Sequence, residues 1–535
     1  MRIIDAETRL NRFLVILKGS VSISLATIIM IMSICNYQRI SPYIIKFFSA
    51  KKDLGYLSEK ISASYKSDDL FMKYDFVNLN GLLMKICARR SFNEVTRLNN
   101  GMLANSIATY QGRRGKTKLI DVLPGFSQFL DTNGSQFVYV LAPCKIDKEG
   151  KLLPDGLENN PNIRADELLD ILSKNDVITL DLRTYLGENP VQIEEYFYKT
   201  DHHWNADGSF HAFQLIMEQL HEINDNIDYS FAVGSRWERH ILENWFLGSL
   251  GKRTGIIYAG VDPLIWYIPA FSTEMSCIIP EDCEILKGEF DDALIRKKYI
   301  NEKNYFKSDP YSIYIGGNHP YVKHLNPNAP NKKKVLLIKD SFAVPVQAFM
   351  STEFSELEVI DPRLFNESSI ADFCKWNKPD LVIMFMNAGT LGNVNYANLG
   401  INTELVKEEE NTEEVLLENY DVISMNSKDK GGEILPINLN GGATYKITFG
   451  QLKIHDGHTE GISMLLFDPV NQELIRHQIF DLDYSSFIED NQWVFTVPEE
   501  KTDCQMIIYP GVYGKNEDVK IECTGITVSE IKLKH

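Results

Sequence analysis

Short, predominantly apolar runs that alternate with stretches of helical spacing constrain the fold of this chain more than any other sequence feature. Helical spacing marks Leu119–Leu130 and Ala165–Ser173. The apolar runs are Phe137–Pro143, Val177–Leu182, Val335–Ile338, Leu357–Asp361 and Leu381–Met386. Strands that are apolar on both faces are typical of parallel sheets covered by helices. The pattern therefore predicts an α/β domain built on a parallel sheet.

The C-terminal part of the chain follows a different pattern. Short alternating segments such as Thr444–Phe449, Gly461–Phe467 and Trp493–Val497 are separated by turn signals such as Asn440-Gly441. Regular short strands between turns predict an all-β sandwich, which we place at residues 431–535. The glutamate-rich stretch before it predicts a solvated acidic linker at 404–430, or an exposed helix.

The N-terminal region holds an uncharged apolar run, Gly19–Tyr37, about long enough to cross a bilayer. We interpret it as a single-pass transmembrane signal anchor; a buried core helix is the alternative. Basic residues flank the run on both sides, so their distribution does not fix its orientation. The expected organisation is a cytoplasmic tip and anchor at 1–52, followed by a stalk at 53–94.

Charge and cysteine content exclude some classes of function. The formal net charge of −18 argues against a nucleic-acid partner, because nothing here neutralises a phosphate backbone. The eight cysteines form no CxxC or Cys/His cluster with metal-ligand spacing, so we expect no metal site. The spacing allows disulfides between Cys277 and Cys283 and between Cys504 and Cys523, with free buried thiols as the alternative.

Two histidines, a carboxylate and a tryptophan are adjacent at Asp201-His202-His203-Trp204. Asn205 is a favourable N-cap for the amphipathic helix that follows, which places these residues in a loop at a helix N-terminus. Asp201 is close enough to His203 to bond one ring nitrogen and fix the tautomer of the other. The pair is the orienting half of an acid/base arrangement and lacks a nucleophile.

Ser341 is the candidate nucleophile. It follows the predicted strand Val335–Ile338 and precedes a helix-capable stretch that begins at Val344-Pro345. At such a junction the hydroxyl lies at the carboxyl end of a strand, where α/β sheets bind ligands. Backbone N–H groups of the helix start can stabilise an oxyanion there. An ordinary helix N-cap is the alternative role for Ser341.

Further candidates surround this pair. Asn387 follows the predicted strand Leu381–Met386 and is either an oxyanion donor or a turn residue. Asn318 lies in a turn-rich stretch with Gly316, Gly317 and His319. The loop Gly248–Gly255 contains glycines and a basic pair, but its spacing matches no phosphate-binding motif, so we expect a structural loop beside the cleft.

Four short motifs and their order along the chain resemble those of a known family. The motifs are Lys199–Trp204, Gly316–Asn318, Leu336–Phe342 and Val359–Arg363. They are similar to those of the DHHW / AlgX–AlgJ-like group of SGNH-hydrolase-type proteins, the bacterial polysaccharide O-acetyltransferases. The resemblance covers residues 95–403 and has the Asp-x-His motif before the serine, the reverse of the order in ordinary SGNH esterases.

The resemblance implies a flavodoxin-like SGNH domain in which Ser341 is the nucleophile, His203 the general base and Asp201 the orienting residue, with no cofactor. A separate Gly-x-Asn-Asp block for the oxyanion hole is not recognisable. Asn318, Asn387 and the backbone N–H of Ser341 are therefore the oxyanion candidates. His202, the variable middle residue of the motif, is a candidate substrate contact.

The resemblance also implies an activity and a location. The expected protein is an O-acetyltransferase of a cell-envelope or secreted polysaccharide, with its catalytic domain outside the cytoplasmic membrane. A polytopic membrane protein would supply acetyl groups. The C-terminal sandwich would bind carbohydrate, with Trp493, Tyr509 and Tyr513 as the aromatic candidates, although these residues could equally belong to the sandwich core.

Three rival functions remain open at this stage. A carbohydrate acetyl esterase would use the same residues with water as the acceptor. A non-catalytic glycan-binding scaffold would keep its glycan affinity when Ser341 is replaced. A metal-dependent hydrolase would use Asp201, His202 and His203, but no further ligand cluster is recognisable and chelator-insensitive activity would exclude it.

Overall fold

The computed structural model describes scattered residues between 27 and 55, and residues 72–106, 119–391, 396–400, 412–426, 432–481, 492–515 and 517–532. The chain separates into two units. One comprises Met1–Ala88 with Thr254–Tyr258, and the other comprises Arg89–Arg253 and Ala259–His535. The expected anchor lies almost entirely outside the described residues. Within the described part of the chain, no helix is both long and apolar enough to span a bilayer.

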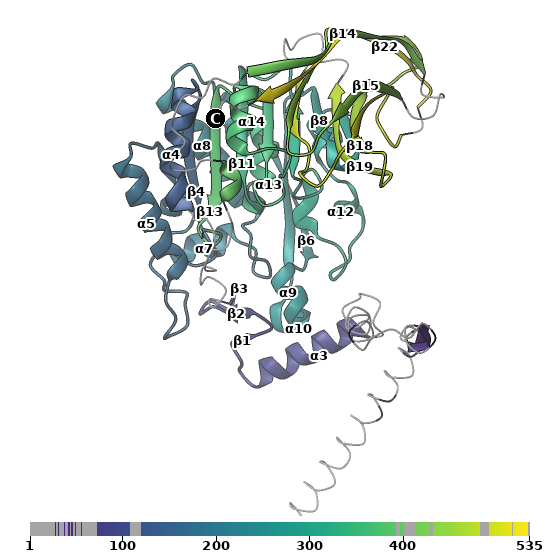
Figure 1. Cartoon of the computed structure of the whole chain (residues 1–535). Coiled ribbons are helices and arrows are strands. Elements are labelled where there is room, and N and C mark those ends of the chain that lie inside the picture. Colours follow the sequence, from purple (N-terminus) through teal and green to yellow (C-terminus); the bar gives the residue numbers. More distant parts are fainter. Residues whose placement is uncertain are drawn as a thin grey trace, which may run out of the picture. The chain divides into compact units, whose positions relative to one another are not determined.

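An eight-stranded mixed sheet forms the centre of the larger unit (Figure 1), in the order β5-β4-β13-β11-β12-β10-β8-β9. The parallel part consists of β5 (Thr179–Asp181), β4 (Gln136–Ala142), β13 (Leu381–Asn387), β11 (Asn331–Lys339) and β12 (Phe354–Ile360). These strands coincide with the predicted apolar runs. Val335, Leu336, Leu337 and Ile338 of β11 are completely buried, as expected for a central strand.

The second part of the sheet corrects the expectation of an all-parallel sheet. The three remaining strands, β10 (Tyr321–Leu325), β8 (Met275–Ile279) and β9 (Glu284–Gly288), pair antiparallel with their neighbours. Only a 3₁₀ turn at Pro280–Asp282 and the following Cys283 separate β8 from β9. A connection this short can make a hairpin, whereas a parallel crossover needs a dozen or more residues.

The helices cover both faces of the sheet. The connection from β11 to β12 contains α13 (Val344–Met350), and the connection from β12 back to β13 contains α14 (Ile370–Asn377). The two connections run in opposite directions across the sheet, so right-handed crossovers place these helices on opposite faces. The helix α8 (Ala206–Ile223) packs against α13, while α4 (Leu119–Thr132) packs against α14 and α5 (Asn160–Lys174).

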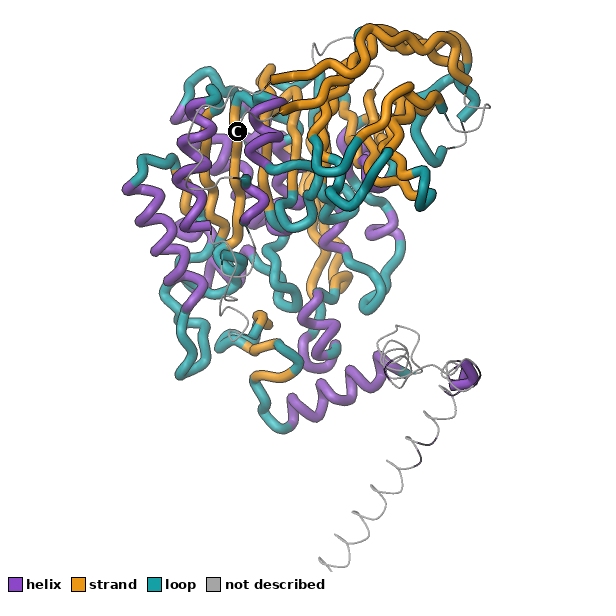
Figure 2. Tube along the Cα trace, viewed as in Figure 1, coloured by secondary structure: helices purple, strands orange, loops and turns teal. Residues whose placement is uncertain are grey.

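Smaller elements complete the α/β region (Figure 2). A two-stranded ribbon consists of β6 (Trp237–Phe246) and β7 (Asp262–Pro269), and a small sheet consists of β1 (Ser91–Phe92), β2 (Val95–Arg97) and β3 (Leu103–Asn105). The short helices are α6 (Arg183–Leu186), α7 (Pro190–Tyr196), α9 (Ser249–Thr254), α10 (Ile256–Ala259), α11 (Phe290–Leu294) and α12 (Lys298–Asn301), with longer α3 (Lys73–Ile86) in the smaller unit.

The C-terminal region is β-rich, as predicted, and has two sheets. One has the order β14-β22-β16-β20, with β17 also paired to β22, and the other has the order β15-β21-β18-β19. The bounds are β14 (Thr412–Asn426), β15 (Glu433–Leu439), β16 (Thr444–Thr448), β17 (Gln451–Asp456), β18 (Gly461–Asp468), β19 (Glu473–Asp481), β20 (Gln492–Thr496), β21 (Cys504–Tyr509) and β22 (Lys520–Lys532).

Details of the sandwich differ from the sequence-based expectations. Part of the segment expected to be an acidic linker forms β14, because Val422 and Met425 contribute to the sandwich core. Trp493 is also buried in that core against Phe495, which favours the core alternative over a sugar platform. The thiols considered for disulfides are all free: Cys277, Cys283, Cys504 and Cys523.

Candidate active site

The loop before α8 is held at both ends. Asn205 caps the helix, and its Oδ1 accepts a hydrogen bond from the backbone N–H of Gly208 at 2.9 Å. Trp204 is completely buried, and its indole Nε1–H donates to the carbonyl oxygen of Phe342 at 2.9 Å. The tryptophan therefore joins the loop directly to the turn that carries Ser341.

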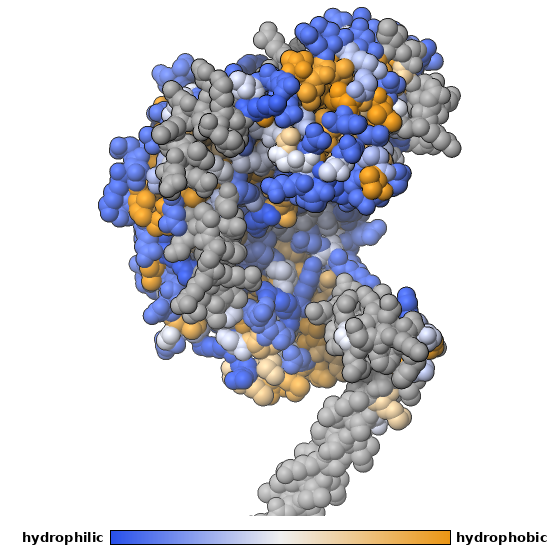
Figure 3. Space-filling model, in the orientation of Figure 1, coloured by the Kyte–Doolittle hydropathy of each residue, from blue (hydrophilic) through white to orange (hydrophobic). Residues whose placement is uncertain are grey.

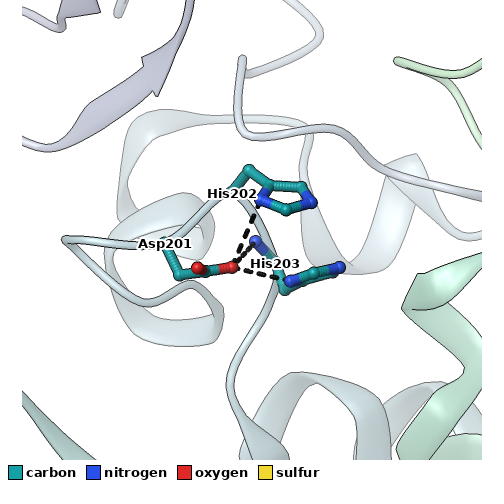
Figure 4. Close-up of side chains that lie close together, drawn as sticks. All are labelled: Asp201, His202 and His203. Atoms are coloured by element: carbon teal, nitrogen blue, oxygen red, sulfur yellow. Dashed lines mark hydrogen bonds and ion pairs between the residues drawn. The ribbon is translucent and has the colours of Figure 1, made fainter. Parts of the chain in front are cut away.

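Asp201 orients His203 through two hydrogen bonds (Figure 4). Its Oδ1 lies 2.6 Å from Nδ1 of His203 and 3.0 Å from the backbone nitrogen of the same residue, while its Oδ2 accepts from Ser249 N–H at 2.6 Å. Burial tends to raise the pKa of Asp201, but the charges of His202 and His203 and these hydrogen bonds hold it well below its usual value. The carboxylate is thus ionised where it faces His203.

The other ring nitrogen of His203 points at Ser341. Nε2 of His203 and Oγ of Ser341 are 2.8 Å apart, and both side chains are about nine-tenths buried. Asp201, His203 and Ser341 therefore form a continuous carboxylate–imidazole–hydroxyl chain, although 138 residues separate the histidine from the serine. This arrangement can remove the hydroxyl proton and stabilise the imidazolium that results.

Asp340, rather than Ser341, performs the capping role at this strand-to-helix junction. Its Oδ1 accepts from Phe342 N–H at 2.9 Å, and its Oδ2 accepts from Asn387 N–H at 2.7 Å and from the Thr390 hydroxyl at 2.9 Å. The Ser341 hydroxyl is consequently available to His203. Among the described residues, no hydrogen bond engages the backbone N–H of Ser341, which leaves it free to bind an oxyanion.

Comparisons with known proteins identify the family that the chain resembles. Residues 181–360 match the family model described as DHHW protein, and residues 105–231 match the model described as an SGNH hydrolase-like domain, acetyltransferase AlgX. The family resemblance is confirmed. A search of curated proteins found no match.

Several solved structures resemble the chain. PatB1 of Bacillus cereus is 21% identical, with 55% of this chain and 96% of that chain covered and a TM-score of 0.45. A DHHW family protein from Eubacterium siraeum is 19% identical, with 58% and 96% covered and a TM-score of 0.40. AlgX of Pseudomonas aeruginosa is 12% identical, with 84% and 98% covered and a TM-score of 0.32.

Lys145 and Asp262 clamp the segment that leads into the DHHW motif. The buried Nζ of Lys145 donates to the carbonyl oxygens of Lys199 at 2.9 Å and Asp201 at 2.6 Å. The carboxylate of Asp262 accepts from the N–H groups of Lys199 and Thr200, both at 2.7 Å, and from the Thr200 hydroxyl at 2.5 Å. Backbone and side chain are thus fixed immediately before Asp201.

Sequence reasoning did not identify these two residues as part of the site. Lys145 follows β4 as Ser341 follows β11, so a polar residue just beyond a buried strand was the available signal. Asp262 begins β7, and no local pattern distinguishes it from a turn aspartate. Its role depends on a contact with Thr200, which lies 62 residues earlier in the chain.

The buried position of Lys145 predicts a dependence of stability on pH. Burial lowers the pKa of Lys145 to about 7, whereas an unfolded lysine titrates near 10.4. Between these values the unfolded chain binds more protons than the folded chain, so the free energy of unfolding contributed by this group rises with pH, by up to about 1.4 kcal/mol per pH unit. The contribution is complete above the unfolded pKa and is lost as pH falls through 7.

Urea unfolding of the full chain and of Lys145→Met across this pH range measures the effect. We expect the difference between the two unfolding free energies to change with pH, because only the unsubstituted protein carries the titrating ammonium group of Lys145. A constant difference from neutral to alkaline pH would contradict the assignment.

The stretch Gly248–Gly255 was expected to be a structural loop, but most of it forms the short helix α9, and its first residues support Asp201. Gly248 lies so close that an added Cβ would stand 2.3 Å from the Cβ and 2.5 Å from the Cα of Asp201. Its N–H donates to the Thr200 hydroxyl at 2.8 Å, and Ser249 bonds the Asp201 carboxylate. Only a residue without a side chain fits here.

Gly248→Ala is therefore expected to destabilise the protein by about 1–3 kcal/mol or more, because the backbone of Asp201 must move to admit a methyl group. Thermal or urea unfolding measures this loss. The matched control is Gly234→Ala, where the nearest atom to an added Cβ is the flexible end of Gln214 at 3.4 Å. Equal stabilities of the two variants would show that the loop is not tightly packed.

Aromatic rings hold the imidazole of His203 from two sides. The ring of Tyr311 stacks on it with a centroid distance of 3.9 Å and an interplanar angle of 6°, and the ring of His202 lies 3.7 Å away on a tilt of 39°. The Tyr311 hydroxyl donates to the carbonyl oxygen of Ser341 at 3.0 Å. Tyr311 therefore fixes both the histidine plane and the serine turn, a role that sequence reasoning missed because nothing local marks it.

His202 is the most exposed member of the motif. About a third of its side chain is accessible, and its Nδ1 lies 3.1 Å from the Ser249 hydroxyl. Burial and the neighbouring charge of His203 lower the pKa of His202 to about 3, so its ring is neutral near pH 7. A neutral, partly exposed imidazole beside the ring of His203 is suited to contact a substrate.

The two asparagine candidates lie elsewhere. The Asn387 side chain donates to the Pro143 carbonyl and accepts from Gly389 N–H at 2.8 Å, which favours its turn role. Asn318 accepts from the buried Nζ of Lys339 at 2.7 Å. Within the described part of the chain, no hydrogen bond joins either side chain to Ser341.

Lys339 connects the remaining family motifs. Its Nζ lies 3.8 Å from Oδ2 of Asp361, and Arg363 makes a two-point contact with the same carboxylate. Burial lowers the pKa of Lys339 to about 8. The motifs around Asn318, Lys339 and Asp361-Pro362-Arg363 therefore meet as one ionic group at the carboxyl ends of β11 and β12.

Among the residues that the structure describes, two groups of side chains have donor atoms close enough to share a metal ion: Asp201, His202 and His203, and separately Glu281, Asp282 and His319. In the first group both carboxylate oxygens of Asp201 already accept hydrogen bonds, from His203 and Ser249. In the second group the two carboxylates are exposed and only the histidine is buried. Exposed acidic groups of this kind are common without a metal.

Proposed function

We propose that the chain is an extracytoplasmic O-acetyltransferase that acts on a cell-envelope or secreted polysaccharide through an acetyl-serine intermediate. One observation carries the proposal: the unbroken chain from Asp201 through His203 to Ser341, with contacts of 2.6 and 2.8 Å. The match of residues 105–231 to a model named for the acetyltransferase AlgX supports acetyl transfer as the reaction.

In the first half-reaction, Nε2 of His203 takes the Ser341 proton while Oγ attacks the carbonyl carbon of an acetyl ester. The backbone N–H of Ser341 is placed to bind the oxyanion. Collapse of the tetrahedral intermediate releases the donor oxygen, which takes the proton from His203. In the second half-reaction, a sugar hydroxyl gives its proton to His203 and attacks the acetyl carbonyl carbon. Collapse of this second intermediate breaks the bond to Oγ of Ser341, which takes the proton back from His203. Asp201 stabilises the imidazolium in both.

We also propose that Gly19–Tyr37 anchors the protein in the cytoplasmic membrane with its active site outside. The length and uncharged composition of this run support the anchor. No free acetyl donor is then available on the outer side of the membrane, where the active site would lie. A polytopic membrane protein that passes acetyl groups across the bilayer is therefore the expected partner.

The test follows the fate of the acetyl group. The full-length chain is given p-nitrophenyl acetate with and without neutral, amino-sugar and uronic-acid oligosaccharides, and both nitrophenolate release and acetylated sugar are measured. A transferase yields acetylated oligosaccharide at the expense of acetate. Release of acetate alone with every acceptor would assign the esterase, and turnover no faster than that of Ser341→Ala would refute serine acyl transfer and favour the scaffold.

A further inference from the structure

One face of α3, a helix of the smaller unit, packs against residues 254–257. Asn78 accepts from the backbone N–H of Ile256 at 2.8 Å, and the Nζ of Lys85 donates to the carbonyl oxygen of Ile257 at 2.9 Å. Gly81 lies between these two residues and contacts the backbone of Thr254, since an added Cβ would stand 2.1 Å from the Thr254 carbonyl oxygen. These positions are three and four residues apart, so they define a single face of the helix.

The opposite face presents a row of large apolar side chains to solvent. Met72 immediately precedes the helix, and Leu79, Leu83 and Ile86 recur at intervals of four and three residues, which aligns these three on one side of it. Their exposed fractions are 47%, 47%, 49% and 71%. Apolar surface is visible where Figure 1 draws α3 (Figure 3). We call these four residues the α3 stripe.

The charge around the stripe is opposite to that of the whole protein. Residues 72–90 contain the basic residues Lys73, Lys85, Arg89 and Arg90 and a single acidic residue, Asp75, whereas the chain has a formal net charge of −18. An apolar stripe flanked by basic side chains is typical of helices that lie in a membrane interface. Basic groups near such a surface are attracted by anionic lipid headgroups.

We propose that the α3 stripe lies in the interfacial region of an anionic phospholipid bilayer. The apolar side chains would enter the boundary between headgroups and acyl chains, and basic side chains near the helix ends, such as Lys73, would extend to the headgroups. The stripe follows the uncharged run Gly19–Tyr37 in the sequence, so both apolar segments can meet the same membrane. The inference concerns a surface remote in sequence from Ser341 and does not depend on the reaction proposed above.

The experiment measures the surroundings of a nitroxide attached at Leu83→Cys in the full chain, with Cys35, Cys87 and Cys283 replaced by serine and the buried cysteines kept. The chain is reconstituted in vesicles of phosphatidylcholine with phosphatidylglycerol, and in vesicles of phosphatidylcholine alone. Collision with oxygen reports lipid and collision with a nickel chelate reports water. The matched control is a label at Val470→Cys, an apolar residue of the sandwich that is 75% exposed.

We expect the oxygen-to-nickel ratio at Leu83 to be several-fold higher than at Val470 in the anionic vesicles, and to fall in vesicles of phosphatidylcholine alone. Adding Leu79→Glu should lower the ratio without changing thermal unfolding, because Leu79 is exposed and makes no packed core contact. This second variant keeps the test informative if the label itself perturbs the helix.

Three results would overturn the proposal. A Leu83 label as accessible to nickel as the Val470 label would place the stripe in water. A label shielded from both reagents with spin–spin broadening would show that a second copy covers the stripe, and the same shielding without broadening would show that another part of the chain does. Failure of the chain to associate with either vesicle would also refute it, and none of these readouts depends on acetyl transfer.

Discussion

Replacing Ser341 with alanine is expected to lower the rate of acetyl-ester turnover by at least about 10³-fold, because the hydroxyl bonded to Nε2 of His203 is removed. The fold should persist, since Asp340, Trp204 and Tyr311 hold the turn through contacts that do not involve the Ser341 hydroxyl. We expect the free energy of unfolding to change by no more than about 1 kcal/mol, the value of one ordinary hydrogen bond.

Initial rates with p-nitrophenyl acetate and thermal unfolding measure the two expectations. The matched control is Ser351→Ala, which removes a buried hydroxyl that donates to the Ala348 carbonyl at 2.7 Å, away from His203. Acid-quenched native protein should carry an acetyl group on the peptide that contains Ser341, and the variant should not. An acetyl group found on another peptide would identify a different nucleophile and refute the proposed role of Ser341.

The second large effect is expected for Asp201→Asn, which should lower the turnover rate by about 10³- to 10⁴-fold. The carboxylate accepts the Nδ1–H of His203, which leaves Nε2 unprotonated toward Ser341. An asparagine can donate to Nδ1 and thereby favour the tautomer with its proton on Nε2. That tautomer cannot take the serine proton, so the loss arises from chemistry and not from altered packing.

The comparison variant is Asp207→Asn, in the first turn of α8. Asp207 also bonds a cationic side chain, Arg239, at 2.7 Å, but it makes no contact with His203 or Ser341. Rates and thermal unfolding of the two variants should therefore diverge: Asp201→Asn loses turnover, whereas Asp207→Asn loses at most a small amount of stability. Equal retention of activity would exclude Asp201 as the orienting group.

Local sequence patterns were enough to predict the elements that carry the site. The apolar run Val335–Ile338 became the centre of β11, and Asn205 caps α8 as its position suggested. The juxtaposition of Asp201, His203 and Ser341 was expected from the family resemblance, because the residues are 138 positions apart and no local pattern brings them together. The structure supplies the distances that the resemblance could not.

Tertiary contacts decided what the sequence left open. Ser341 and Asp340 are both good helix caps, and the pairing of Asp340 with Asn387 and Thr390 selects the aspartate. The glutamate-rich segment gave no indication of β14, since a partner strand at the end of the chain stabilises it. The antiparallel strands β8 and β10 were missed because residues 225–330 lack the helix–strand alternation on which the prediction relied.

The attachment of the serine turn to β13 has a consequence for the newly synthesised chain. Asp340 shapes the turn, but its second oxygen accepts hydrogen bonds from residues 47 and 50 positions further on. A nascent chain that has emerged as far as α13 already contains Asp201, His203 and Ser341, yet the strand that completes the cap has not been made. We expect such a chain to be chemically inert, so that its nucleophile becomes reactive only after the whole sheet has assembled.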